Sequence, residues 1–189
     1  MTHETIKKKR SKYSEPEAIM AISRFGISNV IEIGADFIIE RYIPFTPFAP
    51  TLDQLAELTK RIHRTTHENK NLVHGDLGFN NATVINTIPK CFDYEHAHFG
   101  NLYADLGRIL LRCCKSDRDV ESFFDIYSGR LPDLEVLRGG LIYFCEWQNL
   151  IRSEKKLPFS EVPLKRRERL VKTRECLKDI LKAFKDPVL

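Results

Sequence analysis

The sequence predicts an α+β protein, with a small sheet near the N terminus followed by a longer and mainly helical part. Two runs of β-branched and aromatic residues, Asn29 to Ile33 and Phe37 to Ile43, flank a Gly-Ala-Asp turn and predict two paired strands. Pro44, Pro47 and Pro50 then end the sheet and form a stiff connector. Beyond this connector most apolar residues recur at spacings of three and four, as in amphipathic helices.

The N-terminal elements can be placed by their capping signals. A strand is expected at Thr5 to Lys9. Ser14-Glu15-Pro16-Glu17 has the pattern of a capping box, which predicts a helix that ends at Gly26 in a left-handed C-cap. Thr51 to Gln54 forms a second capping box, which predicts a helix that ends near Arg64.

The remaining elements follow from apolar periodicity and turn residues. We expect strands at 71–74, 82–85 and 91–94, a turn at 86–89, and helices at 104–114, 121–127, 134–152 and 163–184.

Composition excludes several classes of protein. With 42% apolar and 30% charged residues, the 189-residue chain resembles ordinary soluble proteins. No run approaches the roughly 20 apolar residues that span a bilayer, and the first residues lack the apolar core of a signal peptide, so we expect a cytoplasmic protein. The five cysteines show no C-x-x-C spacing and are interpreted as core residues.

Positive charge is concentrated near the C terminus. Residues 154–185 contain eleven Lys/Arg against five Asp/Glu, a surplus of six within a net charge of +4. Because the apolar residues of the helix expected at 163–184 fall on one side, we interpret this helix as a packed element with a solvated basic face. Nucleic-acid binding is the less favoured reading.

Three polar residues form the most informative group. Asp76 and Asn81 lie five residues apart on a Gly- and Asn-rich loop, and Asp93 follows an apolar strand, so one hairpin can bring all three together. Phosphoryl transfer requires a carboxylate near the acceptor hydroxyl and oxygen ligands for Mg²⁺. A role for Asp76 and Asn81 as simple turn caps is the structural alternative.

The same stretch resembles a known superfamily. His74-Gly75-Asp76, Asn81, Asp93-Tyr94-Glu95 and Asp105-Leu106 look like the H-G-D-x-x-x-x-N, D-x-E and D-L motifs of aminoglycoside phosphotransferases and choline kinases. This resemblance implies a protein-kinase-like fold that uses ATP and Mg²⁺. It implies Asp76 as the catalytic base, Asn81 and Asp93 as magnesium ligands, and supporting roles for the remaining residues His74, Glu95 and Asp105.

The resemblance continues upstream, in reduced form. The segment containing Glu40 and Tyr42 looks like the strand and hinge that meet adenine. Lys9, with Lys8 as an alternative, is the candidate for the phosphate-binding lysine, and Glu17 is the candidate for its partner on the helix. No G-x-G-x-x-G precedes the catalytic loop, so the hairpin that covers the phosphates is missing. We therefore predict a truncated N-terminal lobe at 1–43 and a helical C-terminal lobe at 44–189.

The predicted function is ATP-dependent phosphorylation of a hydroxyl group on a small molecule such as a sugar or an amino alcohol. Two alternatives remain open: an atypical serine/threonine protein kinase or ATPase acting in a complex, and a nucleotide-binding pseudokinase. The short N-terminal lobe also raises the prospect of a protein partner that completes the ATP lid.

Overall fold

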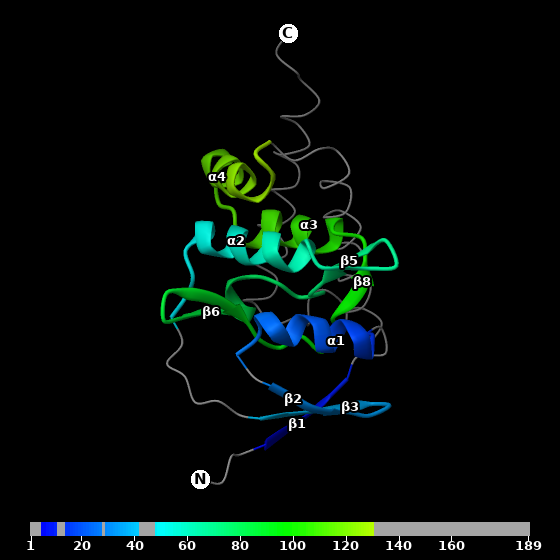
Figure 1. Ribbon diagram of the computed structural model, residues 1–189. Coiled ribbons are helices and arrows are strands. Elements are labelled where there is room, and N and C mark those ends of the chain that lie inside the picture. Colours follow the sequence, from blue (N-terminus) through cyan, green and yellow to red (C-terminus); the bar gives the residue numbers. More distant parts are fainter. Residues whose placement is uncertain (1–4, 11–13, 28, 42–47, 131–189) are drawn as a thin grey trace, which may run out of the picture.

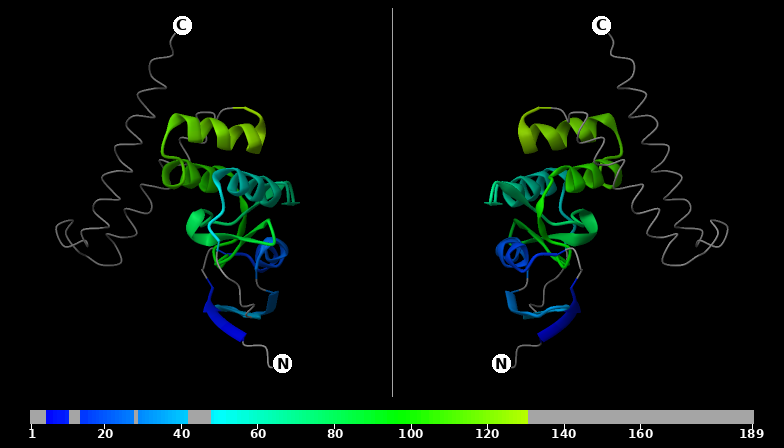
Figure 2. Two further views of the ribbon diagram at one scale, coloured as in Figure 1. Left: turned by 90° about the vertical axis from the view of Figure 1, so that its left-hand side faces the viewer. Right: turned by 90° about the vertical axis from the view of Figure 1, so that its right-hand side faces the viewer.

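The structure is a computed structural model that describes residues 5–10, 14–27, 29–41 and 48–130. An N-terminal sheet lies at one end, helix α1 (Pro16–Ile22) lies above it, and three longer helices lie at the other end (Figure 1). Both side views in Figure 2 keep this order of layers. The predicted mixture of a small sheet and a helical remainder is confirmed.

The N-terminal sheet contains β1 (Thr5–Lys9), β2 (Asn29–Ile33) and β3 (Phe37–Arg41) in the antiparallel order β1-β3-β2. Lys8 stands opposite Ile38, and both share a face with the buried Glu40. Because side chains alternate along a strand, Lys9 belongs to the opposite face. The register of β1 thus decides which lysine side chain faces the interior of the protein.

Helix α1 differs from the prediction at both ends. Its N-cap is Glu15 rather than Ser14, and no side chain caps it. The Glu15 carboxylate instead accepts a hydrogen bond from the Phe99 backbone N–H at 3.0 Å, a tertiary contact that spacing along the sequence does not reveal. A 3-10 turn, η1 (Ser23–Phe25), follows α1, and Gly26 has φ −80° rather than a left-handed conformation.

The expected hairpin is present with one changed boundary. After the 3-10 turn η2 (Phe79–Asn81), β6 (Ala82–Ile85) pairs with β7 (Ile88–Cys91). The prediction of a strand at 91–94 is wrong, because Asn86 and Thr87 both adopt positive φ and close a tighter turn, so that β7 starts and ends earlier. A third sheet, in the order β4-β5-β8, joins β4 (Thr66–His67), β5 (Lys70–Val73) and β8 (His98–Gly100).

The β6–β7 hairpin and the β4-β5-β8 sheet form the central layer of the protein. Three helices cover it: α2 (Leu52–His63), α3 (Tyr103–Arg112) and α4 (Asp117–Ser128). The Thr51 capping box is confirmed. Helix α4 begins earlier than predicted because Ser116 and Asp119 form a further capping box.

One buried apolar cluster runs from α1 through the central layer to α4. Its largest fully buried members include Ile19, Ile38, Leu58, Tyr94 and Phe123. Cys91, Cys113 and Cys114 are buried, in agreement with their interpretation as core residues.

Some predictions concern other parts of the chain. The helices predicted at 134–152 and 163–184 and the lobe boundary at residue 43 lie outside the described residues. In the described part of the chain, no helix has the length and apolar character needed to cross a membrane.

Candidate active site

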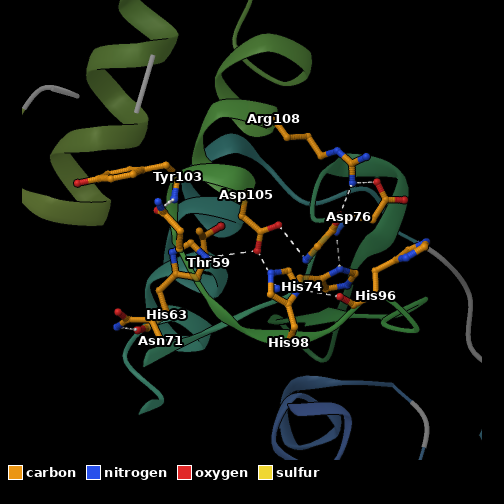
Figure 3. Close-up of polar contacts among 12 residues, drawn as sticks. Thr59, His63, Asn71, His74, Asp76, His96, His98, Tyr103, Asp105 and Arg108 are labelled. Atoms are coloured by element: carbon orange, nitrogen blue, oxygen red, sulfur yellow. Dashed lines mark hydrogen bonds and ion pairs between the residues drawn. The ribbon is translucent and has the colours of Figure 1, made fainter. Parts of the chain in front are cut away.

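The loop from His74 to Asn81 is held by Asp105 of α3. The Asp105 carboxylate accepts hydrogen bonds from the backbone N–H groups of His74 at 2.8 Å and Gly75 at 3.0 Å. His63, at the end of α2, lies 3.3 Å from the same carboxylate through Nε2 (Figure 3). Burial opposes the ionised form, but the His63 contact and the other donors outweigh it and lower the pKa of Asp105. The loop is therefore anchored by a buried carboxylate.

His74 connects the loop to the hairpin. Its Nδ1 accepts a hydrogen bond from the Asp76 backbone N–H at 3.2 Å, and its Nε2 lies 3.1 Å from the Phe92 carbonyl oxygen. These two partners require a neutral ring that carries its proton on Nε2. Burial lowers the pKa of His74, which is consistent with that form. His74 thus fixes the distance between the segments that carry Asp76 and Asp93.

Asp76 is contacted on both of its carboxylate oxygens. Asn81 Nδ2 donates to Oδ2 at 2.9 Å and to the Asp76 carbonyl oxygen at 2.8 Å. Arg108 of α3 forms an ion pair with Oδ1, and Arg112 Nη1 lies 3.9 Å from the same oxygen. Burial raises the pKa of Asp76, while the charge of Arg112 and the Asn81 hydrogen bond oppose that increase. The side chain is 29% exposed, so a substrate can still reach it.

Asn81 and Asp93 lie next to each other at one end of the hairpin. The Phe92 N–H donates to the Asn81 carbonyl oxygen at 3.0 Å, which extends the pairing of β6 and β7 by one step. Asp93 follows with φ +62°, a left-handed conformation that aspartate tolerates better than most residues. Such a conformation costs free energy and is concentrated at functional sites. The two residues expected to hold Mg²⁺ are therefore neighbours at this end of the hairpin.

Lys8 places a positive charge beside Asp93. Its Nζ lies 3.3 Å from Asp93 Oδ1 and 3.5 Å from Glu40 Oε2. Burial acts against the ammonium ion, but the carboxylates of Glu40 and Asp93 outweigh it and raise the pKa of Lys8. This lysine links the N-terminal sheet to the end of the hairpin.

Lys8 and Glu40, rather than the predicted Lys9 and Glu17, lie beside the other site residues in the structure. Lys9 is exposed on the opposite face of β1, because adjacent residues in a strand point to opposite sides. Glu17 is exposed in the first turn of α1, and the glutamate that reaches the lysine is Glu40 of β3. Glu40 thus contributes a buried side chain here, in addition to the adenine-facing backbone role predicted for its segment.

Glu95 forms a carboxyl pair with Asp93. Burial and the hydrogen bond to Asp93 raise the pKa of Glu95 to about 7. Burial also acts to raise the pKa of Asp93, but the hydrogen bond from Glu95 and the charge of Lys8 outweigh it and lower that pKa. The remaining predicted residue, Tyr42, lies outside the described residues.

The donor set fits magnesium. Asp93 offers a carboxylate that is 43% exposed, and Asn81 offers an amide oxygen, because its Nδ2 already donates to Asp76. Within the described ranges, no three His, Cys, Asp or Glu side chains are grouped so as to hold a metal ion by themselves. Mg²⁺ commonly takes one or two protein ligands and completes its octahedron with phosphate oxygens and water.

Sequence reasoning missed three residues of the site: Arg108, Arg112 and His63. The signal for the arginines was available, since they follow Asp105 by three and seven residues and so share its face of α3. His63 gave no such signal, because only the packing of α2 beside α3 brings it to Asp105.

Comparison with known proteins gives a result at the level of the fold. No protein-family model matches the sequence, and no curated protein is significantly similar to it. A choline kinase, LicA from Streptococcus pneumoniae, is structurally similar with a TM-score of 0.63 and 13% identity over 94% of this chain and 86% of that one. The protein-kinase-like fold of the aminoglycoside phosphotransferase and choline kinase type is confirmed.

Two aminoglycoside phosphotransferases give the same result. A thermostable mutant of APH(4)-Ia in its apo form has a TM-score of 0.60 and 12% identity over 96% of this chain and 87% of that one. The gentamicin complex of APH(2")-IIa has a TM-score of 0.54 and 15% identity over 92% of this chain and 84% of that one. All three neighbours are phosphotransferases.

Proposed function

We propose that this chain is a kinase that transfers the γ-phosphoryl group of ATP to a hydroxyl group of a small molecule such as a sugar or an amino alcohol. One observation carries the proposal: at one end of the β6–β7 hairpin Asn81 contacts Asp76 at 2.8 and 2.9 Å, Lys8 contacts Asp93 at 3.3 Å, and Phe92, the neighbour of Asp93, donates to the Asn81 carbonyl oxygen at 3.0 Å. These four side-chain types are the ones that phosphoryl transfer from ATP requires. A cytoplasmic location is part of the proposal.

Each residue has a distinct role. When bound by Asn81 and Asp93, Mg²⁺ neutralises phosphate charge and orients the phosphates for in-line attack. Lys8 places its ammonium group beside Asp93, where it can meet the phosphates. Asp76 orients the acceptor hydroxyl and accepts its proton as the new P–O bond forms and the bond to the ADP oxygen breaks. Since a carboxylate oxygen has more than one acceptor site, its present contacts leave room for that hydroxyl.

The test separates nucleotide binding from transfer. In the full chain, Mg²⁺ with ATP at 100 times its dissociation constant should stabilise the fold by about 2.7 kcal/mol in a thermal-shift titration. Asp93→Asn should remove most of the magnesium-dependent part of this effect. Asp76→Asn should keep the binding and lose transfer, measured as ADP release across a panel of hydroxyl acceptors. Asp36→Asn, an exposed turn residue, is the matched control.

Two outcomes would contradict the proposal. Nucleotide binding that does not depend on magnesium would remove Asn81 and Asp93 from their assigned role. Undiminished transfer by the Asp76→Asn chain would show that Asp76 is not the base.

One feature favours a second candidate, a nucleotide-binding module completed by a protein partner. Within the described strands β1 pairs with β3 alone, so no described strand borders its other edge, close to Lys8. ATP phosphates that no lid covers lack backbone hydrogen-bond donors and a low-dielectric environment, so we expect weak ATP binding by the isolated chain. Micromolar or tighter binding by the chain alone would argue against the need for a partner.

A further inference from the structure

We propose that Tyr127 of α4 and His63 of α2 are positioning residues for the loop from His74 to Asn81, which they hold through Asp105. The Tyr127 hydroxyl donates to His63 Nδ1 and supports the ring form whose Nε2–H donates to the Asp105 carboxylate. The inference deepens the kinase function proposed above and rests on it only for its kinetic test, because its structural tests need no activity.

A line of hydrogen-bonding contacts joins α4 to the loop. The Tyr127 hydroxyl oxygen lies 2.9 Å from His63 Nδ1, and His63 Nε2 lies 3.3 Å from Asp105 Oδ2 (Figure 3). The Asp105 carboxylate accepts from the N–H of His74 at 2.8 Å and from that of Gly75, the residue before the proposed base, at 3.0 Å. One side chain from each of α4, α2 and α3 therefore takes part in holding the loop.

The His63 ring is fixed by its surroundings. In Figures 1 and 2, α4 is the described helix farthest from the N-terminal sheet, and α2 packs against it. The His63 side chain is 3% exposed and meets the Tyr127 ring edge to face, with ring centroids 5.7 Å apart. Asn71 Nδ2 donates to the His63 carbonyl oxygen at 2.8 Å, which holds the last residue of α2. The ring therefore has little freedom to turn, and its two nitrogens keep their partners.

The chemistry of the partners sets the direction of the hydrogen bonds. Burial opposes ionisation of Asp105, but its hydrogen-bond donors outweigh burial and lower its pKa, so the carboxylate is ionised at neutral pH and only accepts. His63 Nε2 must therefore carry a proton, and in the neutral ring Nδ1 is then an acceptor. Burial raises the pKa of Tyr127 to about 12, so the phenol keeps the proton that it donates.

Loss of the Tyr127 hydroxyl would weaken the whole line of contacts. Hydrogen bonds in series polarise one another in a low-dielectric interior, so a donor removed at one end weakens the bonds at the other. The loop backbone beside the base would then be held less firmly. The rate of transfer depends steeply on that position, because displacing a reacting group by about 1 Å can cost about 100-fold.

Hydrogen exchange in the full chain tests this link without any activity. Tyr127→Phe removes the hydroxyl and keeps the ring, which stacks on Phe123. Exchange of the His74 and Gly75 amides, relative to that of the Leu58 amide within α2, should become at least about fivefold faster, the effect expected for the loss of one hydrogen bond.

Lys60→Met is the matched control. Lys60 Nζ donates to the Ile126 carbonyl oxygen at 2.7 Å, so this variant also removes a hydrogen bond between α2 and α4, but one outside the line that leads to Asp105. It should lower the melting temperature to a similar extent, yet change the exchange ratio by less than about twofold. A purely structural role of the contact between α2 and α4 would move both variants alike.

Nitrogen NMR of the full chain with labelled histidine tests the direction of the hydrogen bonds. The signals of His63 are assigned by their loss in His63→Gln. At neutral pH the ring should carry a proton on Nε2 and none on Nδ1.

Two substitutions of His63 separate the roles of its nitrogens in catalysis. The amide of glutamine reaches the place of Nε2 and donates to Asp105, whereas the shorter asparagine reaches only the place of Nδ1. His63→Asn should therefore lower kcat at least about tenfold, and His63→Gln should restore most of it, with KM for ATP changed by less than about twofold in both variants.

Three outcomes would overturn the inference. These are an exchange ratio that Tyr127→Phe leaves unchanged or that Lys60→Met raises equally, a proton on His63 Nδ1 at neutral pH, and kcat values for the two His63 variants that do not differ. If the unmodified chain transfers no phosphate, the kinase proposal fails, and the exchange and NMR measurements still decide whether Tyr127 and His63 hold the loop.

Discussion

Replacing Asp105 with asparagine tests whether one buried carboxylate holds the catalytic loop. Asp105 is 1% exposed and accepts hydrogen bonds from two loop N–H groups at 2.8 and 3.0 Å, with His63 a third partner at 3.3 Å. Asparagine keeps one oxygen and turns the other acceptor into an NH₂ group, which would face a backbone N–H. The change therefore removes the charge from the remaining hydrogen bonds and leaves at least one buried donor without a partner.

The expected cost follows from these contacts. Losing a charge-assisted hydrogen bond and leaving one buried donor unsatisfied costs about 1.5–3 and 1–3 kcal/mol respectively, so Asp105→Asn should lower the free energy of unfolding by about 2.5–6 kcal/mol. With a urea m-value of about 2–3 kcal/mol/M for a chain of this size, the unfolding midpoint should fall by about 1–3 M.

Urea unfolding at pH 7, followed by circular dichroism, measures this shift. Asp36→Asn, in the exposed turn between β2 and β3, should change the free energy by less than about 0.5 kcal/mol. Hydrogen exchange should also show faster exchange of the His74 and Gly75 amides in the Asp105 variant. A midpoint shift no larger than that of the control, with both amides still protected, would refute the role given to Asp105.

Three further predictions concern the loop and its lysine. Lys8→Met should weaken binding of Mg²⁺ with ATP by about tenfold or more in calorimetry, whereas Lys9→Met, on the other face of β1, should change it by less than about twofold; equal effects would contradict the register. Gly75→Ala should lower the free energy of unfolding by about 2–3 kcal/mol in urea, because Gly75 has φ +80° and a Cβ would lie 2.6 Å from the His96 carbonyl oxygen. A loss below about 0.5 kcal/mol, the size expected for a surface substitution, would show that the loop is not strained by a side chain at this position. Burial lowers the pKa of His74 below its ordinary value of 6.5. Below pH 6.5 the unfolded chain therefore binds a proton at His74 that the folded chain does not bind, so the free energy of unfolding falls as pH falls. His74→Asn should lose less stability than the unmodified chain between pH 7 and pH 5, while His67→Asn, at an exposed position, should lose as much.

Local sequence patterns determined much of this protein. The Thr51 capping box fixed the start of α2, and the spacing of Asp76, Asn81 and Asp93 placed them on one loop and hairpin, where the structure has them. These features depend on side chains a few residues apart, whose interactions are set by the geometry of a single turn or strand.

Tertiary packing decided the rest. Three consecutive lysines carry no signal for the one that faces inward, and only the pairing of β1 with β3 and the burial of Glu40 select Lys8. Likewise Ser14 had the better capping sequence, yet the chain uses Glu15, whose carboxylate binds Phe99, 84 residues away. Long-range contacts outweighed local preference at both positions, because burying a charged side chain is favourable only where distant groups supply its partners.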